Sequence, residues 1–525
     1  MQPPYSRTLF ELLDEQAARY PAGIAVLGGA HPISYPALAR RARQAAGMLR
    51  GRGIGRGDRV GLLINNRPEW LELAFGAWLL GAVVTPFSTW STRQELAFLL
   101  ADSAVRVLVA VPAFGRENYA AILRDLAAEA PALTTVLLLD GAAGGFADYA
   151  AARDAAAPLP TPAPGDGASA ADDAFILYTS GSTSRPKAIA LAHYLVIENS
   201  FNIGERQGLG PADKILLAPP LFWTYGGVNA LPATFTHGAT LVLQGRFDAG
   251  EALDLIERHR CTAVYTLPGM TDAMVRHPAF RPDRTRSLRT GLTIGSPQDV
   301  LRAAGRLGAA EICNIYGSSE TGGNCCVTDH RWPLARRAQC QGMPLPGVQL
   351  RIVAAADGAP CPPDMPGLVE MRGPYVMRGY TASSAAHNAT AFTPDGWFRS
   401  GDIGALTAEG GFVFHGRASE MMKRAGINIS PAEVEDILMQ HAGVALAGVV
   451  GVPHGTDERI VAFVVPRGDA RPTAAELAAH CRAIASGYKV PDRFELVDAL
   501  PTTVTGKLLR RDLHQQAARL LAAEG

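Results

Sequence analysis

The sequence predicts an α/β protein with a large N-terminal domain and a small α+β C-terminal domain. Short apolar runs recur along the first 300 residues, and stretches with apolar residues at helical spacing separate them. This alternation is typical of doubly wound, mostly parallel sheets covered by helices, and we expect a β-rich subregion near the end of the large domain. At ~100–200 residues per domain, 525 residues exceed one compact core. The apolar fraction of 48% against 19% charged residues excludes a disordered chain.

The strands of the large domain are predicted where four or more apolar residues follow one another. Such runs lie at 59–64, 105–111, 135–140, 174–179, 214–219, 240–244, 262–268 and 289–295. Between strands, residues 36–50 have the apolar spacing of a helix. The longest apolar stretch, 73–87, is shorter than the ~20 residues of a membrane span, so it predicts a buried helix running into a strand. Residues 151–173, rich in Ala, Pro, Gly and Asp, are expected to form a surface connection.

The C-terminal domain is predicted from a change of pattern after about residue 415. Ser430 before Pro431 marks a helix start, and Glu433 completes a capping-box pattern. Two apolar runs follow, GVALAGVVGVP and RIVAFVVP, which we expect to be strands, with helices from 473 to the end. We place the large domain at 1–418 and a mobile C-terminal domain at 419–525.

Charge and cysteine content restrict the possible partners and the cellular location of the protein. Lys+Arg and Asp+Glu both number 49, so the basic excess of a dedicated nucleic-acid binder is missing. The seven cysteines are scattered without a C-x-x-C pair, which favours a reducing compartment over a disulfide framework or a zinc ribbon. The first residues lack a basic segment followed by an apolar core. We therefore expect a soluble cytoplasmic protein with no membrane span and no nucleic-acid partner.

Five polar motifs are candidates for chemistry. The first, residues 178–187, places five Ser and Thr hydroxyls, a glycine and Lys187 after an apolar strand. Backbone N–H groups and hydroxyls in such a loop can surround phosphate oxygens, and the lysine adds a positive charge. It is not a Walker A loop, because G-x-x-x-x-G-K-[ST] is absent. A polar surface turn is the alternative.

Two further motifs carry a carboxylate among small residues. Glu320, in the segment 314–323, could hold Mg²⁺ through oxygen, or could lie in an ordinary helix cap. Asp402 follows Ser400-Gly401, where a carboxylate on a tight turn can accept hydrogen bonds from a ribose diol. The alternative for Asp402 is a turn without a ligand.

The last two motifs are basic. Gly416-Arg417 precedes a segment containing Lys423 and Arg424, and Lys507 lies in PTTVTGKL near the C-terminus. Taken alone, Lys507 would be a solvated surface lysine.

Taken in order, the five motifs resemble the acyl-adenylate-forming superfamily, which includes acyl- and aryl-CoA ligases, carrier-protein adenylation domains and beetle luciferases. The resemblance extends from TLFELLDEQAARYP to PTTVTGKLLRRDL, essentially the whole chain. It implies an acyl-CoA ligase that uses ATP, Mg²⁺ and coenzyme A. A carboxylate attacks the α-phosphate of ATP to give acyl-AMP and pyrophosphate, and the CoA thiol then attacks the acyl carbon and expels AMP.

The resemblance also implies residue roles. Lys507 would contact the carboxylate and the bridging oxygen, Glu320 would hold Mg²⁺, and Asp402 would bind the ribose beside Arg417. The phosphates would be bound by Thr179, Ser180, Gly181, Ser182, Thr183 and Lys187, of which Thr183 is also a catalytic candidate. The nucleotide would be lined by Gly295, Ser296, Pro297, Asn314, Ile315, Tyr316, Gly317, Ser318 and Ser319.

The acid pocket and the moving domain follow from the same resemblance. The pocket would include Phe222, Trp223, Tyr225, Gly226 and Gly227. Relatives often have His where Trp223 stands, and a tryptophan would supply an apolar wall or gate. A roomy aromatic pocket favours an aryl, alicyclic or other bulky acid, without excluding a straight chain. Rotation of the C-terminal domain would exchange Lys507 for the CoA and hinge residues, Ser419, Lys423, Arg424, Gly426 and Asn428, with Gly426 beside the pantetheine tunnel.

Three departures from the family pattern keep alternatives open. The hinge residue is Ser419 instead of Asp or Lys, the phosphate loop has Ser184-Arg185, and the segment before Pro297 is one residue short. The last two leave open an enzyme that only converts a supplied acyl-adenylate into a thioester. A separate carrier-protein pantetheine as acceptor and a homodimer also remain open.

Two other classes are disfavoured. A non-catalytic binding protein would not need Glu320, Asp402 and Lys507 together. A nicotinamide oxidoreductase would place its glycine cluster after a strand, whereas 51–57 precedes one and is expected to be a turn.

Overall fold

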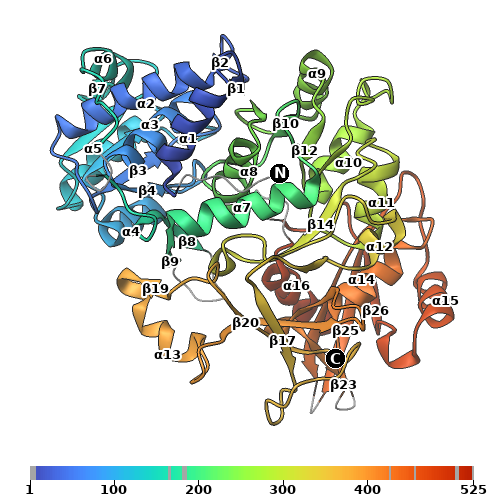
Figure 1. Ribbon diagram of the computed structural model, residues 1–525. Helices are drawn as coiled ribbons and strands as arrows, with labels where there is room; N and C mark the ends of the chain where they lie inside the picture. The colour runs from blue at the N-terminus through green and yellow to red at the C-terminus, as the bar shows by residue number, and fades with distance from the viewer. Residues whose placement is uncertain are drawn as a thin grey trace. The chain divides into compact units, whose positions relative to one another are not determined.

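The computed structural model describes residues 7–162, 167–179, 186–424, 427–454, 457–502 and 508–522. The chain forms two compact units, and each is described by itself. Unit 1 comprises Met1–Gln349 and Met371–Phe398, and unit 2 comprises Leu350–Glu370 and Arg399–Gly525. The α/β prediction is confirmed, with sheets and helices alternating along unit 1 (Figure 1). The predicted boundary at 418/419 concerns a rotation and stays a prediction.

Unit 1 contains a mixed sheet, here called sheet A, in the order β16-β15-β14-β13-β12-β10-β11-β1-β2. Its strands from β14 to β1 are parallel to their neighbours, whereas β2, β15 and β16 pair antiparallel at the two edges. The bounds are β1 Ile24–Leu27, β2 Ile33–Ser34, β10 Lys214–Leu217, β11 Thr240–Leu243, β12 Ala263–Tyr265, β13 Thr290–Thr293, β14 Cys313–Tyr316, β15 Cys326–Val327 and β16 Met343–Pro344.

A second sheet of unit 1, sheet B, has the order β19-β9-β8-β4-β3-β5-β6-β7. It is parallel from β8 to β7, while β9 forms an antiparallel hairpin with β8 and β19 pairs antiparallel with β9. The bounds are β3 Arg59–Leu63, β4 Val83–Pro86, β5 Val107–Ala110, β6 Thr135–Leu138, β7 Ala147–Asp148, β8 Asp173–Thr179, β9 Lys187–Ala192 and β19 Tyr380–Thr381. All eight apolar runs predicted as strands are strands of sheets A and B.

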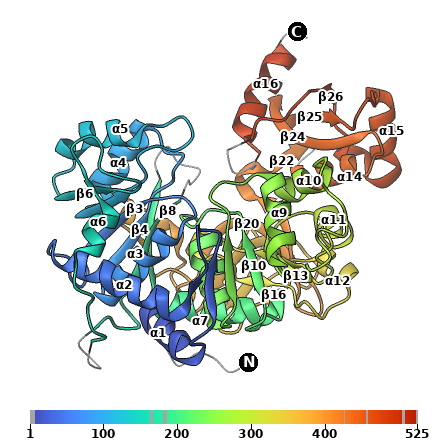
Figure 2. The same cartoon turned by 90° about the horizontal axis from the view of Figure 1, so that it is seen from above.

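Helices cover both sheets. Helices α9 to α12 lie on one face of sheet A (Figure 2). Their apolar side chains pack against its strands, and α7 contacts strands of both sheets. The stretch 73–87 is the end of α3 running into β4, and 36–50 lies in α2, as predicted. The helices of unit 1 are α1 Leu9–Arg19, α2 Tyr35–Arg50, α3 Pro68–Leu79, α4 Arg93–Ser103, α5 Tyr119–Leu126, α6 Tyr149–Asp154, α7 His193–Gln207, α8 Leu231–Thr236, α9 Ala249–His259, α10 Pro268–Arg276, α11 Pro297–Gly305, α12 Leu334–Gln339 and α13 Asn388–Ala391.

Unit 2 combines three smaller sheets with helices. Their orders are β17-β18-β20-β21, β22-β23 and β24-β25-β26 among the described residues. The bounds are β17 Gln349–Val353, β18 Gly367–Arg372, β20 Phe398–Leu406, β21 Phe412–Arg417, β22 Met422–Arg424, β23 Ile427–Ile429, β24 Val444–His454, β25 Asp457–Pro466, β26 Arg493–Leu496, α14 Pro431–Met439, α15 Ala474–Ile484 and α16 Arg510–Ala522.

Two details of unit 2 differ from the prediction. Ser430 caps α14 by accepting a hydrogen bond from Glu433 N at 3.3 Å, but the Glu433 carboxylate pairs with Lys489 in place of closing the capping box. The region after 473 is not purely helical, because β26 pairs in parallel with β25. Both differences come from partners distant in the sequence.

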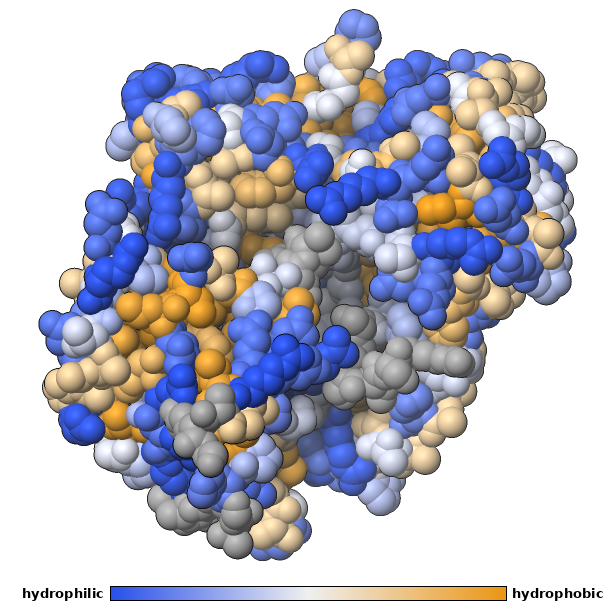
Figure 3. Space-filling model, turned by 180° about the vertical axis from the view of Figure 1, so that it is seen from behind, coloured by the Kyte–Doolittle hydropathy of each residue, from blue (hydrophilic) through white to orange (hydrophobic). Residues whose placement is uncertain are grey.

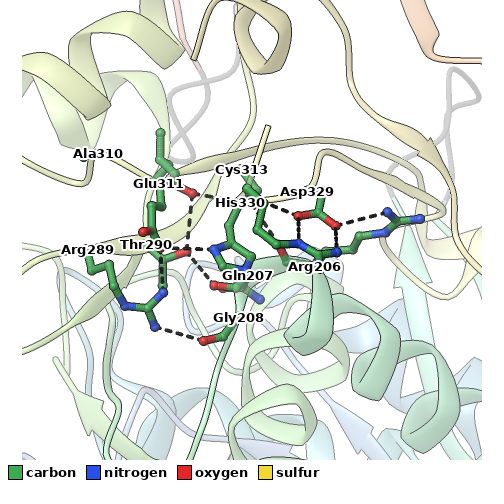
Figure 4. A network of polar contacts seen from close by, with 12 residues as sticks. Arg206, Gln207, Gly208, Arg289, Thr290, Ala310, Glu311, Cys313, Asp329 and His330 are labelled. Carbon is green, nitrogen blue, oxygen red and sulfur yellow. Dashed lines mark hydrogen bonds and ion pairs between the residues drawn. The ribbon is translucent and has the colours of Figure 1, made fainter. Parts of the chain in front are cut away.

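The amino-terminal ends of β13 and β14 are tied to the end of α7 by a polar network (Figure 4). Thr290 Oγ1 donates to Gln207 O at 2.9 Å, and Arg289 binds Glu311 Oε2 at 2.7 Å. His330 Nδ1 lies 3.1 Å from the same Glu311 oxygen. Burial opposes ionisation of Glu311, but the hydrogen bonds from Arg289 and His330 outweigh it and lower the pKa of this carboxyl. The network fixes the two strands whose opposite ends carry predicted site residues.

The surface shown in Figure 3 intersperses hydrophilic residues with smaller apolar areas. No helix in the described part of the chain is long and apolar enough to cross a lipid bilayer.

Candidate active site

The predicted site residues of unit 1 follow strands whose carboxyl ends share an edge of a sheet. In sheet A, residues 221–224 come shortly after β10, 294–297 after β13 and 317–321 after β14, and these strands are parallel. In sheet B, Thr179 ends β8 and the loop 87–92 follows the parallel β4. Ligands of open α/β sheets bind beyond the carboxyl ends of the strands, so the topology gathers these segments where a ligand is expected.

The segment before α11 forms a regular helix start. Ser296 caps α11 in a reciprocal capping box with Asp299, and Pro297 is the first helical residue. A Cβ on Gly295 would lie 2.7 Å from Asp299 Oδ2 and 2.8 Å from Asp299 Cβ, so a side chain there would displace the capping Asp299. Asn314 Nδ2 donates to Gly295 O at 3.4 Å and to Cys340 O at 3.2 Å. The shortened segment is therefore a well-formed loop held from β14.

The loop after β14 is equally constrained. Ile315 and Tyr316 are buried on the strand, and a Cβ on Gly317 would lie 1.9 Å from Gly323 O. Ser319 Oγ lies 2.6 Å from Thr224 Oγ1, which joins this loop to the one after β10. Ser318, half-buried, begins the short helix η3 Ser319–Thr321 as its N-cap.

Glu320 lies half-buried in η3 with one carboxylate oxygen engaged. Its Oε1 accepts a hydrogen bond from Tyr380 Oη at 3.0 Å, and its backbone oxygen accepts from Met377 N at 2.7 Å. Among the described residues, no group of three or more His, Cys, Asp or Glu is placed to hold a metal. A single accessible carboxylate fits Mg²⁺, which proteins commonly bind through one or two carboxylates plus substrate phosphates.

The hairpin of β8 and β9 carries the first motif. Thr179 and Lys187 are paired across the two strands, and Thr179 Oγ1 donates to Lys187 O at 3.5 Å. Lys187 Nζ lies 4.9 Å from the centre of the Tyr380 ring. Ser180, Gly181, Ser182, Thr183 and the departure Ser184-Arg185 lie outside the described residues.

Sequence reasoning missed the residue that fixes the end of β8. Tyr178 Oη donates to Asp102 Oδ2 at 2.7 Å, and burial together with this carboxylate raises the pKa of Tyr178 far above its ordinary value. Asp102 Oδ1 also accepts from Ser383 N at 3.2 Å. Asp102 lies in the last turn of α4, and no sequence motif surrounds it.

Three aromatic side chains meet beyond β10 and β4. Trp90 lies edge-on to Phe222 and to Trp223, with ring centres 5.2 Å apart in both pairs. Trp90 and Trp223 are half-buried, whereas Phe222 is buried. Edge-to-face contacts of this kind are favourable for aromatic rings. Trp90 was not a predicted site residue, and its one signal in the sequence is an aromatic residue in the polar loop after a strand.

The neighbouring residues of the predicted pocket have packing roles. A Cβ on Gly226 would lie 2.1 Å from Pro220 O, and one on Gly227 would lie 2.2 Å from Leu221 O. Tyr225 is buried and donates to Leu292 O at 2.9 Å, and burial raises its pKa well above the ordinary value. The two glycines thus permit close packing of the π-helical segment η2, Thr224–Ala230, instead of leaving open space. Their contact with substrate stays a prediction.

In unit 2, Asp402 and Arg417 lie opposite each other on β20 and β21. Arg417 Nε lies 3.0 Å from Asp402 Oδ1, and Arg417 Nη1 donates to Ser400 O at 3.1 Å. The Asp402 side chain is 6% exposed and that of Arg417 is 45% exposed. Gly401 has φ +74°, a conformation that favours glycine. The predicted ribose contact and its basic neighbour are therefore brought together.

The remaining predicted residues of unit 2 follow β21 along the chain. Ser419 is in η5, Ala418–Glu420, and Lys423 pairs with Asn428 across β22 and β23. Lys423 is exposed, whereas the Arg424 guanidinium binds the carbonyls of Tyr488 and Val490 at 2.9 Å and also Asp492. Arg424 thus anchors β22 within unit 2. Gly426 and Lys507 lie outside the described residues.

Comparison with known proteins agrees with this geometry. The family model described as AMP-binding enzyme matches residues 13–381, and the one described as AMP-binding enzyme C-terminal domain matches 433–507. The chain is 34% identical to a feruloyl-CoA synthase of Amycolatopsis over 95% of this chain and 97% of the relative. It is 32% identical to an indoleacetate–CoA ligase of Aromatoleum aromaticum over 97% of this chain and 98% of that relative.

Solved structures give the same result. The anthranilate CoA ligase AuaEII in complex with anthranoyl-AMP superposes with a TM-score of 0.88 at 25% identity, covering 99% of both chains. ATP-bound MatB from Rhodopseudomonas palustris superposes with a TM-score of 0.86 at 25% identity, covering 97% of this chain and 98% of MatB. The chain belongs to the AMP-binding enzyme family, the acyl-adenylate-forming superfamily, and within it to the acyl-CoA ligases.

Proposed function

We propose that this acyl-CoA ligase activates a bulky, largely apolar carboxylic acid, aryl or alicyclic, as its acyl-adenylate and transfers the acyl group to CoA. The observation that carries the proposal is the contact of Trp90 with Phe222 and Trp223. Flat aromatic walls favour ring-containing ligands through apolar contact and edge-to-face geometry. Feruloyl-CoA synthase and indoleacetate–CoA ligase, two relatives of this chain, are named for aromatic acids.

The residues are proposed to share the work of two half-reactions. In the first, a carboxylate oxygen bonds to the α-phosphorus of ATP and pyrophosphate leaves. Glu320 would hold Mg²⁺, which would supply charge neutralisation to the phosphates, and Thr179 and Lys187 would bind the phosphates themselves. Asp402 binds the ribose hydroxyls, with Arg417 holding its carboxylate. Lys507 contacts the acid, and in the second half-reaction the CoA sulfur bonds to the acyl carbon, AMP leaves with the bonding electrons and the thiol proton passes to solvent.

A product assay tests the acid class. The protein is incubated with ATP, Mg²⁺ and CoA plus a panel of cinnamic, indole, cyclohexane and straight-chain acids, and acyl-AMP and acyl-CoA are detected by mass. We expect the ring-containing acids to be the better substrates. If only straight-chain acids react, the proposed class is wrong. Acyl-CoA formation from synthetic acyl-AMP without ATP-dependent adenylation would instead favour the thioester-only alternative.

A variant links the acid class to the aromatic cluster. Trp90→Ala removes one wall, and we expect roughly a tenfold change in the ratio of kcat/KM between bulkier and smaller acids, the usual size for altered apolar contacts. Trp332→Ala is the matched control, because Trp332 is also half-buried but stacks under Arg336. An unchanged ratio in Trp90→Ala would remove this residue from the pocket.

We also propose a cytoplasmic location, supported by seven cysteines that are all free thiols, as a reducing compartment favours. A carrier-protein acceptor and a homodimer stay predictions from the resemblance.

A further inference from the structure

Tyr380 touches both charged residues of the unit 1 site. Its hydroxyl donates to Glu320 Oε1 at 3.0 Å, and the centre of its ring lies 4.9 Å from Lys187 Nζ. Glu320 follows sheet A, whereas Lys187 begins β9 of sheet B. No motif in the sequence pointed to Tyr380, which lies 60 positions from its carboxylate partner.

The position of Tyr380 is strongly determined by its backbone. It begins β19, which lies beside β9 (Figure 1). In the register of this pair, Tyr380 lies opposite Ile189. Tyr380 N donates to Asn388 Oδ1 at 2.7 Å, and Asn388 Nδ2 donates back to Tyr380 O at 3.0 Å. The residue is 8% exposed. A tyrosine held in this way offers its hydroxyl and its ring face at fixed places.

Lys187 and Glu320 carry opposite charges, yet no ion pair joins them in the described part of the chain. Each instead contacts Tyr380, the carboxylate through a charge-assisted hydrogen bond and the ammonium through the ring face. A direct Lys187–Glu320 pair would neutralise the carboxylate needed for a cation and the ammonium needed for phosphate. The tyrosine ring gives the ammonium a neutral partner and the hydroxyl orients the carboxylate.

We infer that Tyr380 is a positioning residue that holds Glu320 for Mg²⁺ and keeps Lys187 apart from it for the phosphates of ATP. The inference rests on the proposed roles of Glu320 and Lys187. Tyr380 is assigned no contact with the reacting atoms or with the acid.

Two substitutions separate the hydroxyl from the ring. Tyr380→Phe removes only the hydrogen bond to Glu320, and Tyr380→Leu removes the ring face as well. Binding of Mn²⁺ to the enzyme–ATP complex is measured by electron paramagnetic resonance, and binding of ATP in EDTA by calorimetry. We expect Tyr380→Phe to weaken Mn²⁺ binding about tenfold, the usual size for one hydrogen bond to a charged group, with metal-free ATP binding unchanged. Tyr380→Leu should also weaken metal-free ATP binding, by roughly threefold, because a cation–π contact of moderate strength is lost.

A matched control exists in the same unit. Tyr375 is also buried, and its hydroxyl donates to Glu198 Oε2 at 3.3 Å. Tyr375→Phe therefore removes a comparable hydrogen bond outside the site and should leave both binding constants unchanged. Equal effects of Tyr375→Phe and Tyr380→Phe would overturn the inference.

The variant Glu320→Gln distinguishes a failure of the positioning role of Tyr380 from a failure of the proposed metal role of Glu320. If Tyr380 acts through Glu320, Tyr380→Phe added to Glu320→Gln should weaken Mn²⁺ binding no further. Additive effects, or normal Mn²⁺ binding in Tyr380→Phe while Glu320→Gln is impaired, would overturn the positioning role alone. Normal Mn²⁺ binding in Glu320→Gln would overturn the proposed metal role of Glu320 and the inference with it.

Discussion

Asp402→Asn tests the ribose contact proposed for unit 2. The substitution keeps the shape of a side chain that is 6% exposed and removes its charge. Arg417 loses its ion pair, but it is 45% exposed and keeps its hydrogen bond to the carbonyl of Ser400. Because water can solvate the freed guanidinium, the loss in the free energy of unfolding should be about 1 kcal/mol or less. Hydrogen bonds from ribose hydroxyls to an ionised acceptor contribute about 1.5–3 kcal/mol, which corresponds to roughly tenfold to hundredfold in the Kd for ATP.

The assay compares nucleotides as well as proteins. Calorimetry gives the Kd of ATP, 2′-deoxy-ATP and 3′-deoxy-ATP for the unchanged chain and for Asp402→Asn. The unchanged chain should prefer ATP by roughly tenfold or more, since one charge-assisted hydrogen bond is at stake, and Asp402→Asn should bind all three alike.

Glu370→Gln is the matched control. Glu370 lies on β18, in the same sheet as Asp402, and its carboxylate is held by Arg351 at 2.7 Å. This variant loses a similar ion pair and should still prefer ATP. If Asp402→Asn also retains the preference, Asp402 does not bind the ribose and the reasoning is refuted.

Three further predictions concern packing, pH and the half-reactions. Gly317→Ala would place a Cβ 1.9 Å from Gly323 O and should lower both the Tm and the affinity for ATP. Gly305→Ala, where a Cβ would meet no atom within 4 Å, should instead stabilise α11 by about 0.5 kcal/mol. Equal melting curves for the two variants would contradict this prediction. Burial lowers the pKa of His193 from 6.5 to about 4, although the charge of Asp172 acts in the opposite direction. As the pH drops, His193 is therefore protonated in the unfolded chain before it is protonated in the folded one. The free energy of unfolding should fall by about 3 kcal/mol between pH 6.5 and pH 4. His193→Gln should flatten that decline in denaturant midpoints, and an unchanged slope would count against it. Lys507→Ala should abolish acyl-AMP formation far more than thioester formation from supplied acyl-AMP; similar losses in both steps would exclude its assigned role.

The strands of the large unit were predictable because parallel strands buried on both faces are continuous apolar runs. The run at 105–111, for example, contains β5, which is buried along its whole length. The strand β26 was missed, since RFEL is short and half-exposed and becomes a strand by pairing with β25, from Val461 opposite Arg493 to Val464 opposite Leu496. Glu433 shows the same limit, because the capping pattern is local whereas its actual partner, Lys489, is 56 positions away.

The candidate site shows the same difference between residues that a local motif reveals and residues that only the fold reveals. Motif residues such as Glu320 and Asp402 could be identified because small residues surround them within a few positions. Trp90 and Tyr380 could not, because they act through contacts between segments that only the fold brings together. A phosphate loop or a carboxylate turn is a local structure, whereas a pocket wall and a positioning hydroxyl depend on tertiary packing.

The segment from Phe222 to Gly227 combines both kinds of position, and this determines how acid specificity can change. Tyr225 ties the loop after β10 to the carboxyl end of β13, and Gly226 fits against Pro220 O with no room for a side chain. Substitutions there move the backbone that carries Trp223, so they should lower activity toward every acid alike. Trp90 stands on a separate loop, and its ring lies edge-on to those of Phe222 and Trp223. Exchange of Trp90 should therefore reshape the proposed acid pocket without displacing this backbone, which makes Trp90 the position from which a new acid preference is expected to arise.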